Sequence, residues 1–149
     1  MPSQDWELIG TLKTLFESCK DAEEGYRMAA RHADNAELKG MCERYAEQRA
    51  QYASALEAEL ATLDSQPTKM GTISGGLRQG WVSLKDAVTG GSDQAVIDEC
   101  ERGEDAAKRA YEETLAKDLP APVRALVEGQ LWGVREAHYR MRALQLAAK

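Results

Sequence analysis

The sequence predicts an all-α fold, a four-helix bundle made of two helical hairpins joined by a long crossover that carries a short helix. Three observations favour this fold. Apolar residues recur every three or four positions over four long segments, which is the spacing of one helix face. Residues that favour helices dominate the composition, and only 6% of the residues are aromatic. The segment between the two hairpins contains six of the twelve glycines.

The chain has 149 residues, the usual length of one domain, so we expect a single bundle domain spanning 1–149. The predicted helices cover about 4–33, 36–63, 93–117 and 121–148, and the crossover covers 64–92. Ser92 is a favourable N-cap for the third helix. A crossover of this length can travel the length of the bundle, so we expect helices two and three to be parallel. A plain up-down-up-down bundle capped by the linker is the alternative.

Charge and motif content exclude several classes of function. The net charge is −6 without a basic cluster, which argues against a nucleic-acid partner. No apolar run reaches the roughly 20 residues that span a bilayer, and the first ten residues do not resemble a leader, so we expect a cytoplasmic chain without a membrane partner. The three cysteines form no C-x-x-C pair, which argues against a disulfide framework or a thiolate zinc site. No nucleophilic triad or phosphate loop identifies a substrate.

Several polar residues fall on the apolar faces of the predicted helices. They are Glu23, Gln48, Arg49, Glu104, Gln130 and His138. At about 100° per residue, Glu23 lies about 40° from the seam position Cys19. Glu104 stands in the same relation to Cys100. The helical rise brings these groups to one central layer, where an unpaired charge is costly. We therefore expect Arg49 to form an ion pair with Glu23 or Glu104. Core tyrosines are expected to offer their hydroxyls to this layer: Tyr26, Tyr45, Tyr52 and Tyr111.

Short motifs along nearly the whole chain carry a family resemblance. They are Glu24-Gly25-Tyr26, Gln48-Arg49-Ala50-Gln51-Tyr52, Gly80-Trp81, Glu101-Arg102-Gly103-Glu104-Asp105-Ala106 and His138. In these motifs the chain resembles an uncharacterised bacterial four-helix-bundle family of the ferritin-like superfamily. The resemblance implies a ferritin-like bundle and no assigned reaction.

The di-iron members of that superfamily bind metal through one Glu from each of two helices and a Glu-x-x-His motif from each of the other two. Glu23 and Glu104 match the single carboxylates. Helix two has Gln48 and Gln51 where a Glu-x-x-His motif would stand. Helix four keeps His138, but its motif begins with an arginine. A fixed guanidinium in the same layer works against a divalent metal.

Two functions of different classes follow from these residues. We predict a non-enzymatic helical-bundle protein with an interaction or stress-related role, without a cofactor, in which the six residues form a buried polar layer. The alternative is a ferritin-like metal-binding protein with a redox or storage role. In that case Glu23, Glu104 and His138 hold iron, manganese or zinc.

Two aromatic residues mark a candidate interface. Trp132 and Tyr139 are one heptad apart on helix four, and both point away from its apolar seam. Exposed aromatics on one stripe indicate that something covers them. The cover is either Trp81 of the linker helix or a second subunit. We expect a symmetric homodimer through helix four or the linker helix.

Overall fold

The computed structural model describes residues 2–63, 81 and 92–147, with side chains from residue 6 onward. These residues form four long helices and no strand, which confirms the all-α prediction. The helices are α1 (Pro2–His32), α2 (Ala36–Thr62), α5 (Asp93–Leu115) and α6 (Ala121–Ala147). Of the predicted crossover, the structure describes Trp81 and Ser92. The extent of the short helix expected there lies outside the described residues.

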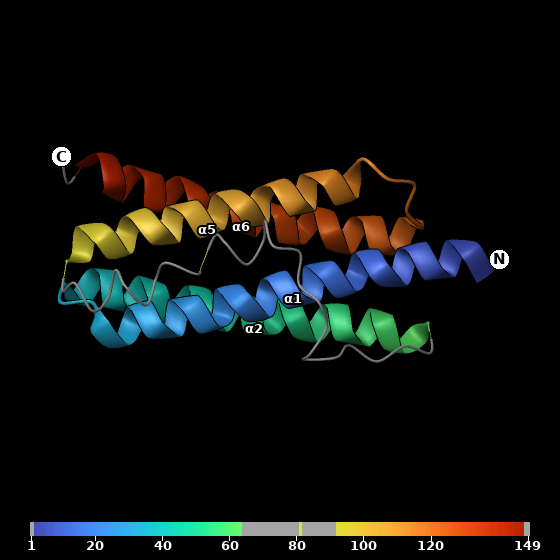
Figure 1. Cartoon of the computed structure of the whole chain (residues 1–149), viewed down its shortest axis with the longest axis horizontal. Helices are drawn as coiled ribbons and strands as arrows, with labels where there is room; N and C mark the ends of the chain where they lie inside the picture. Colours follow the sequence, from blue (N-terminus) through green and yellow to red (C-terminus); the bar gives the residue numbers. More distant parts are fainter. Residues whose placement is uncertain (1, 64–80, 82–91, 148–149) are drawn as a thin grey trace.

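The direction of the helices follows from the contacts at one end of the bundle. The Asp93 carboxylate, at the first residue of α5, accepts hydrogen bonds from the backbone N–H groups of Asp34 and Asn35, each at 2.9 Å. Helix α5 therefore begins at the end where α2 also begins, and the two helices run in the same direction (Figure 1). Helix α1 packs against α2 and α5, and α6 packs against α5 and α2. As a result, α2 and α5 face each other diagonally across the core.

Side-chain caps define two of the helix starts. The Asn35 side chain accepts the backbone N–H of Leu38 at 2.9 Å and caps α2. The Ser92 hydroxyl accepts the backbone N–H of Ala95 at 3.2 Å and caps α5. The N-cap predicted at Ser92 is therefore confirmed.

The apolar core consists of two clusters, one in each half of the bundle. The half near the α1–α2 turn contains, among others, Tyr26, Leu38, Cys42, Val96, Cys100 and Met141. The other half contains, among others, Leu12, Leu56, Leu60, Tyr111, Val127 and Val134. Arg49 and Glu104 belong to neither cluster, although only 1% and 0% of their surfaces are exposed. They lie where the two apolar clusters meet.

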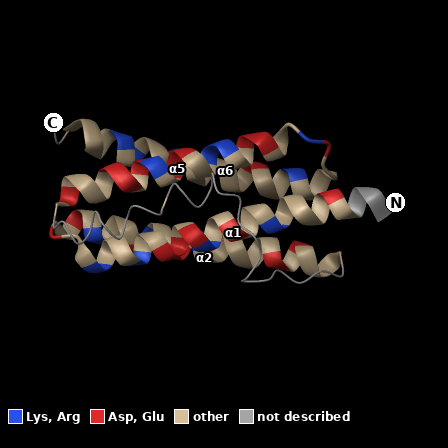
Figure 2. Cartoon of the chain, in the orientation of Figure 1, with Lys and Arg blue, Asp and Glu red and all other residues tan. Residues whose placement is uncertain are grey.

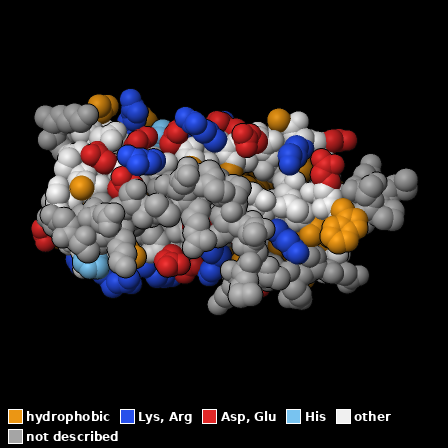
Figure 3. Space-filling view, viewed as in Figure 1, with side chains coloured by type: hydrophobic (Ala, Val, Ile, Leu, Met, Phe, Trp, Pro, Cys, Tyr) orange, Lys and Arg blue, Asp and Glu red, His pale blue; other side chains and the backbone are white. Residues whose placement is uncertain are grey.

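The outer surface of the helices is charged and mixed in sign. Acidic and basic residues are interspersed along all four helices (Figure 2). The face in Figure 3 shows the same mixture, with small groups of hydrophobic side chains between the charges. None of the described helices combines the length and the hydropathy that a membrane-spanning helix requires.

Candidate functional site

The centre of the bundle holds an ion pair that joins the two diagonal helices. Arg49 of α2 donates from Nη2 to both carboxylate oxygens of Glu104 on α5, at 2.5 Å to Oε1 and 2.6 Å to Oε2. The ion pair predicted between Arg49 and one of the inward carboxylates is therefore confirmed, with Glu104 as the partner. Both side chains are fully buried, so solvent screens this pair little.

Two further residues complete the coordination of this pair. Tyr26 of α1 donates its hydroxyl to Oε2 of Glu104 in a very short hydrogen bond. The Tyr26 ring also lies beneath the guanidinium, with Cζ of Arg49 at 5.9 Å from the ring centroid. Nε of Arg49 donates to Oε1 of the neighbouring Gln48 at 3.2 Å. The carboxylate thus accepts three hydrogen bonds from two helices, and the arginine binds acceptors on α2 and α5.

The electrostatics of the pair favour its charged form. Burial acts to lower the pKa of Arg49, but the Glu104 carboxylate outweighs burial and raises this pKa, so the guanidinium stays protonated. Burial also raises the pKa of Tyr26 well above its usual value, and the negative charge of Glu104 adds to the effect. Tyr26 therefore remains a neutral hydroxyl that donates to the carboxylate.

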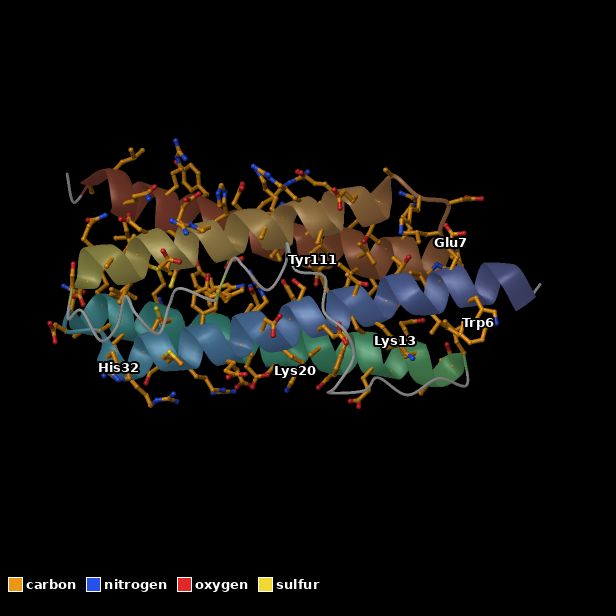
Figure 4. All side chains as sticks on the ribbon, viewed as in Figure 1. Trp6, Glu7, Lys13, Lys20, His32 and Tyr111 are labelled. Atoms are coloured by element: carbon orange, nitrogen blue, oxygen red, sulfur yellow. The ribbon has the colours of Figure 1, made fainter. Side chains whose placement is uncertain are left out.

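A second, uncharged network lies one heptad away in the other half of the core. The Tyr111 hydroxyl of α5 donates to Oε1 of Gln130 on α6 at 2.7 Å and contacts Sγ of Cys19 on α1 at 3.1 Å. Nε2 of Gln130 donates to the backbone carbonyl of Tyr52 on α2 at 3.2 Å. This network therefore links all four helices, and Figure 4 shows Tyr111 in the middle of the bundle beside α1.

The two networks follow one antiparallel register between α1 and α5. Cys19 and Tyr26 are seven residues apart on α1, and Glu104 and Tyr111 are seven residues apart on α5. Because the helices run in opposite directions, Tyr26 meets Glu104 and Cys19 meets Tyr111. Of the core tyrosines expected to contribute hydroxyls, Tyr26 and Tyr111 do so in these networks.

Glu23 does not join the central layer, which corrects the sequence-based placement. Its carboxylate binds Arg27 at 2.8 Å and Lys20 at 3.0 Å, both on the outside of α1. Figure 4 shows Lys20 pointing away from the bundle. The two cations stand three residues before and four residues after Glu23, on the same helix surface. Keeping the carboxylate partly in water beside them avoids the cost of burying it.

His138 also lies outside the central layer. Its Nε2 contacts Oε2 of Glu101 on α5 at 2.8 Å, and Oδ1 of Asp105 lies at 3.8 Å. Glu101 is the partner that holds His138 at the edge of the α5–α6 contact. Of the six residues predicted to form the layer, four take part in the central networks: Gln48, Arg49, Glu104 and Gln130.

The structure does not bring the three predicted metal ligands together. Glu23, Glu104 and His138 each bind different partners, and the Glu104 oxygens are occupied by Arg49 and Tyr26. In the part of the chain that is described, no three His, Cys, Asp or Glu side chains form a group that fits a metal ion.

The three cysteines are buried free thiols. Burial raises the pKa of Cys19 to about 11. Contact with Cys42, together with burial, raises the pKa of Cys100 well above its usual value. These two sulfurs are therefore protonated near neutral pH, a state in which thiols are poor nucleophiles.

Trp81 fills a notch between α1 and α5 that the sequence did not reveal. A Cβ at Gly25 or at Gly103 would lie 2.3 Å from an atom of the Trp81 indole. The ring also packs edge-on against Tyr26, with centroids 5.0 Å apart. Trp81 therefore contacts Tyr26, which in turn binds the ion pair. Its environment differs from that of Trp132, which is 69% exposed.

One cleft of about 380 Å³ lies at the end of the bundle where α1 begins. Glu7, Leu8 and Thr11 line it from α1. The turn before α6 contributes Lys117, Asp118, Leu119 and Pro120. None of the predicted site residues lines this cleft, so it is separate from the central networks.

Fold and site together define an all-helical bundle protein with a buried ion pair at its centre. Residues 7–117 match the family model described as a domain of unknown function, DUF2383, and the chain belongs to this family. The match contains both partners of the ion pair and the residues that hold Trp81, whereas α6 lies beyond it. No protein with curated annotation matches the chain.

Proposed function

We propose that this chain is a non-enzymatic member of the ferritin-like bundles with an interaction role, in which the central ion pair fixes the packing of the helices. The observation that carries the proposal is the pairing of Arg49 with both oxygens of Glu104 in the fully buried core. Both oxygens of this carboxylate already accept hydrogen bonds and its charge is balanced by Arg49, so it is a poor ligand for a substrate or a metal ion.

The arrangement of the helices supports the ferritin-like assignment. Helices α2 and α5 run in the same direction, and such a bundle with one long crossover is a property of ferritin-like folds (Figure 1). In the di-iron bundles, carboxylates and histidines from all four helices converge on the centre. Here the centre receives a carboxylate from α5, a guanidinium from α2 and a hydroxyl from α1. A cation of the protein itself therefore occupies the place where a metal cation would balance the carboxylate.

The ion pair is suited to a structural role because it forms at only one axial position of α2 relative to α5. A guanidinium and a carboxylate must meet across the diagonal, so any axial shift of α2 relative to α5 would leave two charges unpaired in the core. Apolar side chains alone tolerate such shifts better. The pair thus selects one register of the two hairpins, and the outer faces are left for partners.

Metal analysis tests this proposal. Untagged protein is dialysed against Fe²⁺, Mn²⁺ or Zn²⁺ and then against metal-free buffer, and the retained ions are counted. We expect substoichiometric retention by the wild type and no change in Glu104→Gln. The matched control is Glu47→Gln, which makes the same change at an exposed position of α2. Retention of about one or two ions per chain that Glu104→Gln removes and Glu47→Gln preserves would overturn the proposal.

A further inference from the structure

Helix α6 carries a second seam on the face opposite its core seam, and this seam is apolar except for Glu136 at its centre. Its residues follow the alternating four-and-three spacing of a helix-packing stripe: Ala125, Gly129, Trp132, Glu136, Tyr139, Ala143 and Leu146. The buried seam of the same helix has the same spacing two residues earlier, as in Val127, Val134 and Met141. An offset of two residues is about 200° around the helix, so the second seam faces away from the core.

The large side chains of this outer seam are exposed. Trp132 is 69%, Tyr139 74% and Leu146 57% exposed. Single exposed apolar residues are common, but three large ones on one face of a helix mark an interaction surface. Trp81 does not cover this stripe, because its indole is held between Gly25 and Gly103 on the α1–α5 side.

Gly129 leaves open space on the outer seam. Three buried glycines of the bundle have a clear steric role, since a Cβ at Gly25, Gly103 or Gly133 would collide with a neighbouring ring or hydroxyl. A Cβ at Gly129 would meet no atom within 4 Å. Glycine inside a helix is less stable than alanine, and nothing in the described part of this chain requires it here. A residue without a side chain at this position allows another helix to approach the outer seam closely.

We propose that α6 pairs with α6 of a second copy of this chain, antiparallel, about a twofold axis near residues 135 and 136. In this register Trp132 lies opposite the partner's Tyr139, twice in each dimer. Small Ala125 lies opposite the partner's large Leu146, and Gly129 opposite the partner's Ala143. Each aromatic layer thus has the small residues Gly129 and Ala143 on its outer side, where they let the helices approach and give the rings space.

Charge complementarity selects the antiparallel register. Glu128 and Arg142 are exposed, and neither forms an ion pair within the described residues. Each lies seven residues from position 135, on the same side of the seam, so Glu128 faces the partner's Arg142. Glu136 lies at the axis opposite the partner's Glu136, and it would do so in a parallel pairing as well, so it does not distinguish the two orientations. A parallel pairing would instead place Glu128 against the partner's Glu128, with like charges together.

This inference deepens the interaction role proposed above by naming the partner as a second copy, yet it rests on different residues. The proposed function depends on the buried ion pair and is tested by retained metal. The dimer depends on the exposed seam of α6 and is tested by mass, so either can fail without the other.

Sedimentation of the full chain at tens of micromolar tests the dimer. We expect a dimer for the wild type, and a dissociation constant raised by at least about 30-fold in Trp132→Ala, which is the loss typical of an aromatic anchor. The matched control is Trp6→Ala, because Trp6 is 75% exposed on α1 and lies off the seam. Far-UV circular dichroism verifies that each variant is helical. A monomeric wild type, or equal effects of Trp132→Ala and Trp6→Ala, would overturn the proposal.

A charge swap tests the register separately. Glu128→Arg and Arg142→Glu should each weaken the dimer, because each places like charges together across the axis. The double variant should restore the dissociation constant to within a few-fold of the wild type. Because both residues are exposed, the swap leaves the core intact. A double variant that dissociates at least as readily as either single variant contradicts the antiparallel pairing.

Discussion

Two segments with the same sequence pattern place their glutamates differently in the structure. Cys19 to Glu23 on α1 and Cys100 to Glu104 on α5 share the pattern Cys-x-x-x-Glu, and both cysteines are buried. Glu104 is completely buried and paired across the bundle with Arg49. Glu23 instead is part-buried on α1, where it binds two cations of the same helix. The same angular offset from the seam therefore permits either outcome.

The difference arises from which cation is within reach. Lys20 and Arg27 lie on the same helix surface as Glu23 and bind it while all three remain partly solvated. On α5, Lys108 stands four residues after Glu104 but binds Asp105 instead. Arg49 is the cation that binds Glu104, and it does so inside the core. A carboxylate at the edge of an apolar helix face thus points outward or inward according to the position of the cation that binds it.

Breaking the inner pair should produce the largest effect. Arg49→Ala leaves the Glu104 carboxylate buried with only Tyr26 as a hydrogen-bond donor, so we expect a loss of about 3–5 kcal/mol in the free energy of unfolding. Urea unfolding followed by circular dichroism measures the loss. Arg44→Ala, at an exposed position of α2, is the matched control and should change the free energy by less than about 0.5 kcal/mol.

Removing both charges separates the electrostatic contribution of the ion pair from the packing contribution of its side chains. The variant Arg49→Leu with Glu104→Gln fills the space without a buried charge, and it should be far more stable than Arg49→Ala. If it were as unstable as Arg49→Ala, the cost would lie in lost packing of the long side chain, and the comparison with Glu23 would lose its electrostatic basis.

Where α1 and α5 do behave alike, substitutions should have equal effects. Gly25 on α1 and Gly103 on α5 both face the Trp81 indole, with the same 2.3 Å approach for an added Cβ. Either glycine-to-alanine change should displace the ring and cost about 3 kcal/mol, the upper part of the usual range for overpacking. Tryptophan fluorescence would shift to the red as Trp81 becomes hydrated. Gly10→Ala, where a Cβ meets open space, should instead stabilise the helix slightly.

The two networks can be compared through their tyrosines. Tyr26→Phe removes a hydrogen bond to a buried carboxylate and should cost about 2 kcal/mol, whereas Tyr111→Phe removes one to the neutral Gln130 amide and should cost about 1 kcal/mol. Equilibrium unfolding of both variants measures the difference. Tyr45→Phe is the control and should leave the unfolding free energy unchanged, because the Tyr45 hydroxyl forms no hydrogen bond within the described residues. An equal cost for Tyr26→Phe and Tyr111→Phe would mean that the charge on Glu104 adds nothing.

The sequence predicted what depends on helical periodicity. The four helices, the cap at Ser92 and the inward direction of Arg49 and Glu104 all follow from spacing along one helix. The position of Glu23 was wrong because periodicity gives an angle, not the competition between nearby cations. The choice between the two inward carboxylates depends on the register between helices.

The contacts of Trp81 could not be predicted from the sequence, for a further reason. Its contact with α1 and α5 depends on the path of the crossover, which helix spacing does not give. The glycines at 25 and 103 were a usable signal, since a glycine on the inner face of a helix indicates the close approach of another group. His138 was misplaced in a similar way, because its partner Glu101 lies on a neighbouring helix.

The outer carboxylate should give the smallest effect, and one that depends on pH. Burial acts to raise the pKa of Glu23, but the hydrogen bonds from Arg27 and Lys20 outweigh burial and lower it below the usual 4.5. The stabilisation is therefore present above pH 4.5 and is lost as the pH falls through the lowered pKa. At neutral pH Glu23→Gln should cost less than about 1 kcal/mol, and the difference from the wild type should vanish once the pH is below the lowered pKa. Repeating the substitution in a chain that carries Lys20→Gln and Arg27→Gln isolates the pairing, since the cost should then be absent at every pH. A cost at neutral pH as large as that of Arg49→Ala would show that Glu23 supports the core after all, and the contrast between the two segments would disappear.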